Sequence, residues 1–259
     1  MEIFNYPLYY IGFNKEYILE KKLKYAGFIN VNHFKAINGR NFNIEKLLKD
    51  KKISTRSYLD LKYGRSQHSG IPSLGAVGCT MSHYSLWKKC IESNFPYIII
   101  VEDDVNIPDK IDEKQLKYIS NILKKEKNCY ISTTNKKFDD FFHCGTHFCI
   151  LSKEVCKELV KDAFPMEIQT DAYIWHKHNI GDINIEKNDY FSTLSPLTRK
   201  GDNNQNFFGS TIQDDCFKCM IPSSFKITKI VPFLFFIVVL ILFIYVFYIK
   251  SVFFNKCKK

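Results

Sequence analysis

The chain has 259 residues, of which 46% are hydrophobic and 15% aromatic, so its length suits one domain with an anchor better than two full domains. The formal net charge of +10 would suit a nucleic-acid-binding protein if the charge formed a basic patch. Six of the 37 Lys and Arg residues lie at or beyond the edge of an apolar tail, so 31 basic residues stand against 27 acidic ones before it, and four residues in the whole chain are Arg. This composition excludes a nucleic-acid-binding surface and favours a mildly basic one that meets anionic nucleotides or lipids.

Strands alternate with helices in the first half of the predicted fold. Residues 8–13 are an apolar run typical of a strand, 15–25 have helical spacing, and 31–37 predict a second strand. Residues 40–70 are polar and are expected to form a loop or insertion, with a small helix at 44–50. Residues 79–93 follow with the spacing of a mostly buried helix.

The second half continues this alternation, and its clearest strand is YIIIV at 97–101. Such short, fully apolar, β-branched runs are typical of parallel sheets that are covered on both faces. A helix is expected at 113–125, strands at 129–133 and 148–151, and a further helix at 153–160. The pattern predicts an α/β fold with a mostly parallel sheet flanked by helices.

The C-terminal part predicts a membrane anchor. Residues 230–249, IVPFLFFIVVLILFIYVFYI, are uncharged and long enough for a helix that crosses a bilayer core. A buried core helix is the alternative, although a globular helix of five turns normally carries a polar face. The N-terminus lacks the basic and apolar regions of a signal peptide. We therefore expect a main domain at 1–225 on the cytosolic side of the membrane and a single-pass tail anchor at 226–259.

The nine cysteines are scattered and form no disulfide-like framework. Cys216 and Cys219 make a lone CxxC pair, whereas a zinc site would need a second pair or a partnering His motif. Reduced thiols are the interpretation that fits a cytosolic domain.

Three consecutive acids, Glu102, Asp103 and Asp104, follow the strand at 97–101. Ligands of open α/β sheets bind beyond the carboxyl ends of the strands, and adjacent carboxylates repel one another unless a cation offsets their charge. Glu102 and Asp104 point the same way in extended backbone, so they could share a hard divalent ion such as Mn²⁺ or Mg²⁺. A solvated turn is the alternative, and the strand context leaves both open.

Residues 73–105, SLGAVGCTMSHYSLWKKCIESNFPYIIIVEDDV, resemble glycosyltransferase family 25, which includes lipooligosaccharide and collagen galactosyltransferases. The family's succession of Gly-Cys, Ser-His, an apolar residue with Trp, a strand and Glu-Asp-Asp is present in order and spacing. FKAINGR at 34–40, GTHFCILSKEVCKELV at 145–160 and QTDAYIW at 169–175 resemble other segments of the family. A departure is Ala76, where the family usually has Glu.

This resemblance implies a GT-A-like, Rossmann-type fold and an enzyme that transfers galactose or glucose from a UDP-sugar to an acceptor hydroxyl with inversion. Mn²⁺ or Mg²⁺ would bind Glu102 and Asp104, while Asp103, His83 and Gly78 would contact the donor. The acceptor would belong to a glycan, a glycolipid or a glycoprotein.

Asp171 matches a later acid of the family and would be the general base, although an Asp that caps a helix is an equal alternative. His83 could equally be a structural histidine. His143 and His147 could line the acceptor side, but no metal-ligand spacing singles them out. The competing function is a catalytically inactive, membrane-anchored binding protein of the same fold, which Ala76 favours. A phosphotransferase is excluded by the lack of a phosphate-binding Gly-rich loop with Lys.

Overall fold

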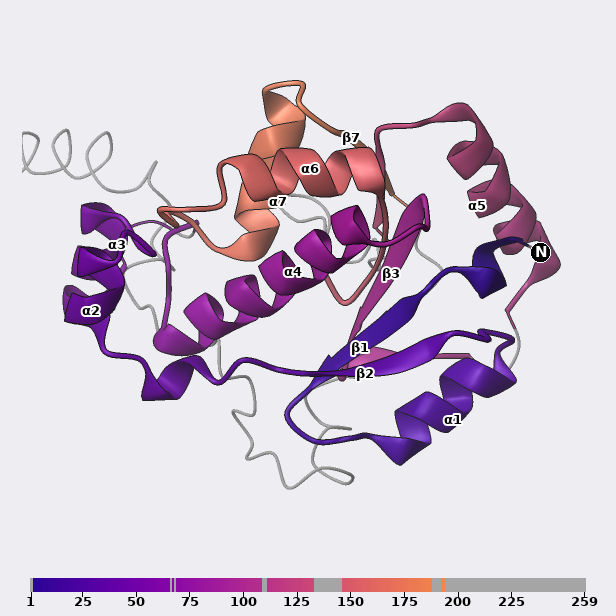
Figure 1. Ribbon diagram of the computed structural model, residues 1–259, viewed down its shortest axis with the longest axis horizontal. Helices are drawn as coiled ribbons and strands as arrows, with labels where there is room; N and C mark the ends of the chain where they lie inside the picture. The colour runs from indigo at the N-terminus through magenta and orange to yellow at the C-terminus, as the bar shows by residue number, and fades with distance from the viewer. Residues whose placement is uncertain are drawn as a thin grey trace, which may run out of the picture. The chain divides into compact units, whose positions relative to one another are not determined.

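The computed structural model describes residues 2–65, 67, 69–108, 111–132, 146–187 and 192–193, all within the compact unit Met1–Asp215. In this part of the chain a six-stranded sheet lies among helices (Figure 1). The predicted anchor at 226–259, with its helix at 230–249, lies outside the described residues. Within those residues, none of the helices has both the length and the apolar composition that a bilayer span requires.

The central sheet has the strand order β2-β1-β3-β6-β5-β7. Its strands are β1 (Leu8–Gly12), β2 (Val31–Lys35), β3 (Tyr97–Glu102), β5 (Cys129–Ser132), β6 (Phe148–Ser152) and β7 (Asn184–Lys187). β1 pairs in parallel with β2 and β3, and β5 pairs in parallel with β7. β6 runs antiparallel to its neighbours β3 and β5. The predicted α/β class is confirmed, and the sheet is mixed because β6 is reversed.

Alternate residues of β3 face opposite sides of the sheet, and both sides are covered. Ile99 and Val101 pack in a core with α1 (Tyr17–Tyr25) and α5 (Glu113–Lys125). Ile98 and Ile100 pack in a second core with α4 (Leu74–Glu92), α6 (Lys153–Lys161) and α7 (Thr170–Asn179). The two-sided burial that the YIIIV run predicts is therefore confirmed.

The small helix predicted at 44–50 is confirmed as α2 (Ile44–Lys49). The rest of the segment at 40–70, predicted as a loop or insertion, contains a second helix, α3 (Thr55–Tyr63), so that prediction is wrong there. Asn43 and Ser54 cap these helices by accepting hydrogen bonds from the backbone amides of Lys46 and Ser57. Only a few apolar residues of this segment, such as Leu47 and Ile53, are buried, and they join it to a third, smaller core. The rest of its side chains can therefore be polar.

Helix α4 begins earlier than predicted because Ser73 caps it by accepting a hydrogen bond from the amide of Ala76. Its first two turns therefore include the small residues at 75, 76 and 78. The remaining elements are short: η1 (Glu2–Asn5), η2 (Gly39–Asn41), β4 (Val105–Asn106) and β8 (Ser192–Thr193), the last two forming a separate pair.

Candidate functional site

The ends of β1, β2 and β3 and the N-terminal half of α4 enclose a cavity. Parallel strands place their carboxyl ends at one edge of a sheet, which is where ligands of α/β folds bind. The lining of the cavity includes Gly12, Asn38, Cys79, His83, Glu102 and Asp103. Three of the predicted site residues, His83, Glu102 and Asp103, thus share one cavity.

Glu102, the last residue of β3, is the most connected of these side chains and is 16% exposed. Its Oε1 accepts a hydrogen bond from Thr146 Oγ1 at 2.6 Å and lies 3.1 Å from His83 Nε2. Its Oε2 lies 3.2 Å from His147 Nδ1. Burial raises the pKa of Glu102, but the hydrogen bonds and positive charge of His147 and His83 outweigh it and hold that pKa well below 4.5. Glu102 is therefore an anion of fixed orientation.

His147 lies between two of the predicted acids. Its Nδ1 is 3.2 Å from Glu102 Oε2 and 3.1 Å from Asp104 Oδ1. Burial lowers the pKa of His147, but hydrogen bonds to Asp104 and Glu102 and their negative charges raise it from 6.5 to about 11. The ring is therefore an imidazolium at neutral pH. His147 lies beside the acids because β6, which follows it, pairs with β3. No local sequence signal predicts that pairing.

Gly78 and Gly39 are positions of close backbone approach between α4 and the segment after β2. A Cβ on Gly39 would lie 1.7 Å from the carbonyl oxygen of Leu74, and one on Gly78 would lie 2.3 Å from that of Ile37. Ser82 Oγ ties the same segments together, because it accepts from the amide of Ile37 at 2.9 Å and donates to the carbonyl of Gly78 at 2.8 Å. Gly78 packs against Ile37 and Gly39 and is not among the residues that line the cavity, so its contact with a donor stays a prediction.

His83 is 1% exposed and hydrogen-bonded to Glu102, as a structural histidine would be. It also lines the cavity, as a site residue would, so the two interpretations are compatible. Asp103 lines the cavity beside β1, where a Cβ on Gly12 would lie 3.7 Å from Asp103 Cβ. These two side chains reach the cavity from α4 and from the turn after β3.

Asp171 lies in the first turn of α7, and the residue at the cap position is Gln169. Asp171 is not the cap residue, but its Oδ1 accepts from the amide of Ala172 at 2.7 Å and so serves a free amide of the first turn, a contact of the kind that the helix-end alternative expects. Its role as general base stays a prediction. A 2.6 Å hydrogen bond between Thr170 Oγ1 and Thr80 Oγ1 holds this turn against α4. Burial, then the charge of Glu102, and to a lesser degree that of Asp171, raise the pKa of the Cys79 thiol well above 9.0.

The donor set around Glu102 fits a hard divalent cation. Oxygens of Glu102 and Asp104 lie 3.2 and 3.1 Å from the same nitrogen of His147, so the two carboxylates converge on one point, which the protonated ring fills here and where a bound cation would take its place. Ligand atoms of Glu102, Asp104 and His147 all lie within 4.8 Å of one another. Mn²⁺ and Mg²⁺ prefer carboxylate oxygens of this kind.

Comparison with known proteins agrees with this geometry. Residues 14–174 match the profile described as "Glycosyltransferase family 25 (LPS biosynthesis protein)". Procollagen galactosyltransferase 2 of Homo sapiens is 30% identical over 95 residues, which are 36% of this chain and 14% of that protein. A glycosyltransferase 25 family member of Anopheles gambiae is 31% identical over 78 residues, 30% of this chain and 12% of that protein.

The lipooligosaccharide biosynthesis protein lic2B of Haemophilus influenzae is 49% identical over 39 residues, 15% of each chain. The matched stretches thus span 12% to 15% of the length of these curated relatives. The match to the family profile, in contrast, covers more than half of the 259 residues and includes the acids after β3 and most of the residues that line the cavity beside them. The chain therefore belongs to glycosyltransferase family 25.

Proposed function

We propose that this protein transfers galactose or glucose from a UDP-sugar to an acceptor hydroxyl, with inversion at the anomeric carbon and with the help of Mn²⁺ or Mg²⁺. The observation that carries the proposal is the convergence of Glu102 and Asp104 on one point, now filled by Nδ1 of His147, beside the cavity that Asp103 lines. Family membership and a mixed sheet with a single reversed strand support a GT-A-like fold for the same reaction.

Glu102 and Asp104 would hold the cation. When bound, it neutralises the charge that develops on the departing diphosphate. Thr146 and His83 contact the same oxygen of Glu102 and keep its carboxylate in one orientation. Asp103 would accept hydrogen bonds from the ribose or the sugar of the donor.

Asp171 would act as the general base, taking the proton of the attacking acceptor hydroxyl at its carboxylate. Its position supports this role because the hydrogen bond between Thr170 and Thr80 anchors its helical turn to α4, which also supplies Cys79 and His83 to the cavity.

The acceptor would be a glycan, a glycolipid or a glycoprotein. The names of the relatives, a procollagen galactosyltransferase and a lipooligosaccharide biosynthesis protein, include both protein and lipid acceptor classes. We further propose that residues 226–259 anchor the chain in a membrane through a helix at 230–249, with the main domain on the cytosolic side.

A second candidate function is binding without catalysis. Ala76 takes the position where the family usually has Glu, and it is 3% exposed within the third core. A binding protein of this kind would keep the cavity but lack one carboxylate that the family usually supplies.

The proposal is tested by incubating the full-length protein with a panel of UDP-sugars and Mn²⁺ and following UDP release by mass spectrometry. We expect release from UDP-galactose or UDP-glucose, and its loss when EDTA removes the metal. Binding of a UDP-sugar without any release would establish the second function. A folded protein that neither binds nor cleaves a UDP-sugar would overturn both.

A further inference from the structure

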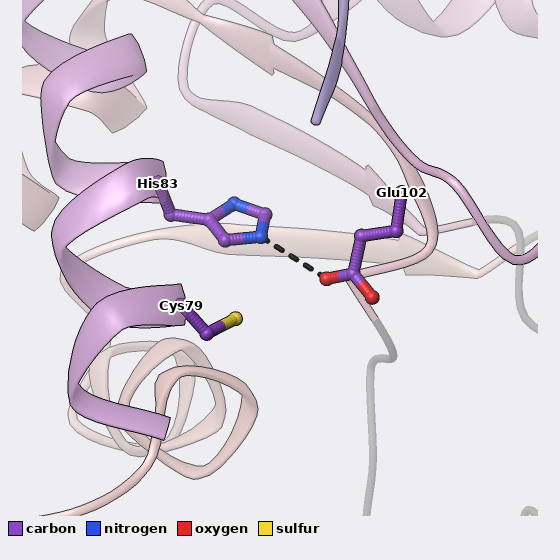
Figure 2. Close-up of side chains that lie close together, drawn as sticks. All are labelled: Cys79, His83 and Glu102. Atoms are coloured by element: carbon purple, nitrogen blue, oxygen red, sulfur yellow. Dashed lines mark hydrogen bonds and ion pairs between the residues drawn. The ribbon is translucent and has the colours of Figure 1, made fainter. Parts of the chain in front are cut away.

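A second group of ligand atoms also includes Glu102, with Cys79 and His83 in place of Asp104 and His147. Atoms of Cys79, His83 and Glu102 that can bind a metal lie within 4.8 Å of one another. Cys79 and His83 are one helical turn apart on α4, so their side chains leave the same face of the helix. Figure 2 shows both pointing toward the carboxylate of Glu102. All three residues line the cavity, although His83 is only 1% exposed and Glu102 16%.

The two groups use different oxygens of Glu102. Oε1 lies 3.1 Å from His83 Nε2, whereas Oε2 lies 3.2 Å from His147 Nδ1. Two neighbouring ligands of tetrahedral zinc are about 3.3 Å apart when each bond is about 2.0 Å long, so the spacing of Oε1 and Nε2 already suits such an ion.

The chemistry of this group differs from that of the two carboxylates. Thiolate and imidazole ligands select thiophilic cations such as Zn²⁺, while Mg²⁺ and Mn²⁺ prefer oxygen. Zinc sites that accept a water molecule or another ligand also have three protein ligands and an open fourth position.

We propose that Cys79, His83 and Glu102 form a binding site for a thiophilic divalent cation of the Zn²⁺ class, with its fourth coordination position toward the cavity. On binding, the thiol of Cys79 releases its proton to solvent and the sulfur binds the metal. His83 coordinates through Nε2 and carries its proton on Nδ1.

Binding at this site has a consequence for the transferase. Zn²⁺ would occupy part of the cavity and one oxygen of Glu102, and so would inhibit transfer from the UDP-sugar. This inhibition rests on the proposed function, whereas binding of the cation does not.

Cobalt titration of the full-length protein tests the site directly, because a thiolate bound to Co²⁺ gives a near-ultraviolet charge-transfer band and tetrahedral Co²⁺ absorbs in the visible range. We expect both signals, and we expect Zn²⁺ to displace them. Cys79→Ser should abolish the charge-transfer band of this site. His83→Gln should weaken binding by more than about tenfold, the smallest loss seen when even a supporting partner of a metal ligand is removed.

Three variants separate this site from others. Cys90→Ser is the matched control on the same helix, since Cys90 is buried against Cys156, and it should keep the band. The double variant Cys216→Ser, Cys219→Ser removes the CxxC pair, and any change in the cobalt signal that it causes measures the background from that pair. Asp104→Asn should keep the cobalt signal while it impairs the hard-cation site, so failure of the proposed function and failure of this site are distinguishable.

An unchanged band in Cys79→Ser, or no sulfur-bound cobalt in the wild-type protein, would overturn the proposal. A measurement without variants gives an independent answer: Zn²⁺ should protect Cys79 from alkylation, read by peptide mass spectrometry, and Mg²⁺ should not. Equal alkylation with and without Zn²⁺ would likewise contradict the site.

Discussion

The backbone amide of Glu102 donates a hydrogen bond to the carbonyl oxygen of His147 at 2.8 Å, and the side chains of the same two residues meet again at 3.2 Å. The end of β3 therefore brings an acid, and the residue before β6 brings a cationic ring, to one point. This double contact makes the orientation of Glu102 depend on the sheet and not on a flexible turn.

Replacing His147 with Gln should lower stability in a pH-dependent way. Its pKa is raised in the folded protein, so its contribution is complete below the ordinary value of 6.5 and is lost as the pH rises through about 11. We expect a loss of about 1.5–3 kcal/mol at neutral pH, the range for a hydrogen bond to a charged group. Urea unfolding of both proteins across pH measures the difference. A difference that does not narrow toward pH 11 would contradict the ion pair.

Replacing Thr146 with Val should also destabilise the protein, because it removes the 2.6 Å hydrogen bond to Glu102 without changing the shape of the side chain. The expected loss is about 1.5–3 kcal/mol, since Glu102 stays charged and largely buried. Thr146→Ser keeps the hydroxyl and is the control. Equal loss in the two variants would show that packing, not the hydrogen bond, matters here.

Asp104→Asn should remove Mn²⁺ binding and lower transfer by at least about 100-fold, the effect of losing one electrostatic contact to a developing charge. Folding should remain, because Asp104 lies in the turn between β3 and β4. Isothermal titration with Mn²⁺ and thermal unfolding measure the two effects. Asp50→Asn, at an exposed carboxylate after α2, is the matched control. Undiminished Mn²⁺ binding in Asp104→Asn would remove this residue from the site.

Asp171→Asn should lower kcat by about 10²- to 10⁴-fold, the usual contribution of a general base, while the affinity for the UDP-sugar stays unchanged. Steady-state kinetics together with donor titration separate the two quantities. A normal kcat would exclude Asp171 as the base, and a loss of donor affinity alone would make it a binding residue.

Gly39→Ala should destabilise the protein by about 3 kcal/mol or more, because the new methyl group would overlap the backbone carbonyl of Leu74, which cannot turn aside as a side chain can. Gly64→Ala is the comparison: Gly64 has a φ of +85° and nothing within 4 Å of the added Cβ, so its cost should be about 1–2 kcal/mol, from backbone strain alone. Chemical denaturation of the two variants measures both. A smaller loss at Gly39 than at Gly64 would contradict the close packing of α4.

Local patterns predicted the elements that carry the site. The apolar run of β3 is buried on both faces, and the acids after it lie at the carboxyl edge of the sheet. Periodicity reports how each element is buried, which is why the α/β class could be predicted. It does not report strand direction, so the reversal of β6 was missed. Composition also hid α3, whose apolar residues Tyr58 and Leu61 are only partly buried against the third core and stand in a polar segment.

The residue types at 102–104 and their place after a buried strand are properties of the sequence by itself, and so is the match to family 25. Only the tertiary structure brought His147 and Thr146 to Glu102, across more than 40 residues of chain. The physical reason is that a carboxylate's partners depend on which strand ends and helix faces meet. Those contacts form through strand pairing and core packing over long separations, which no short window of sequence encodes.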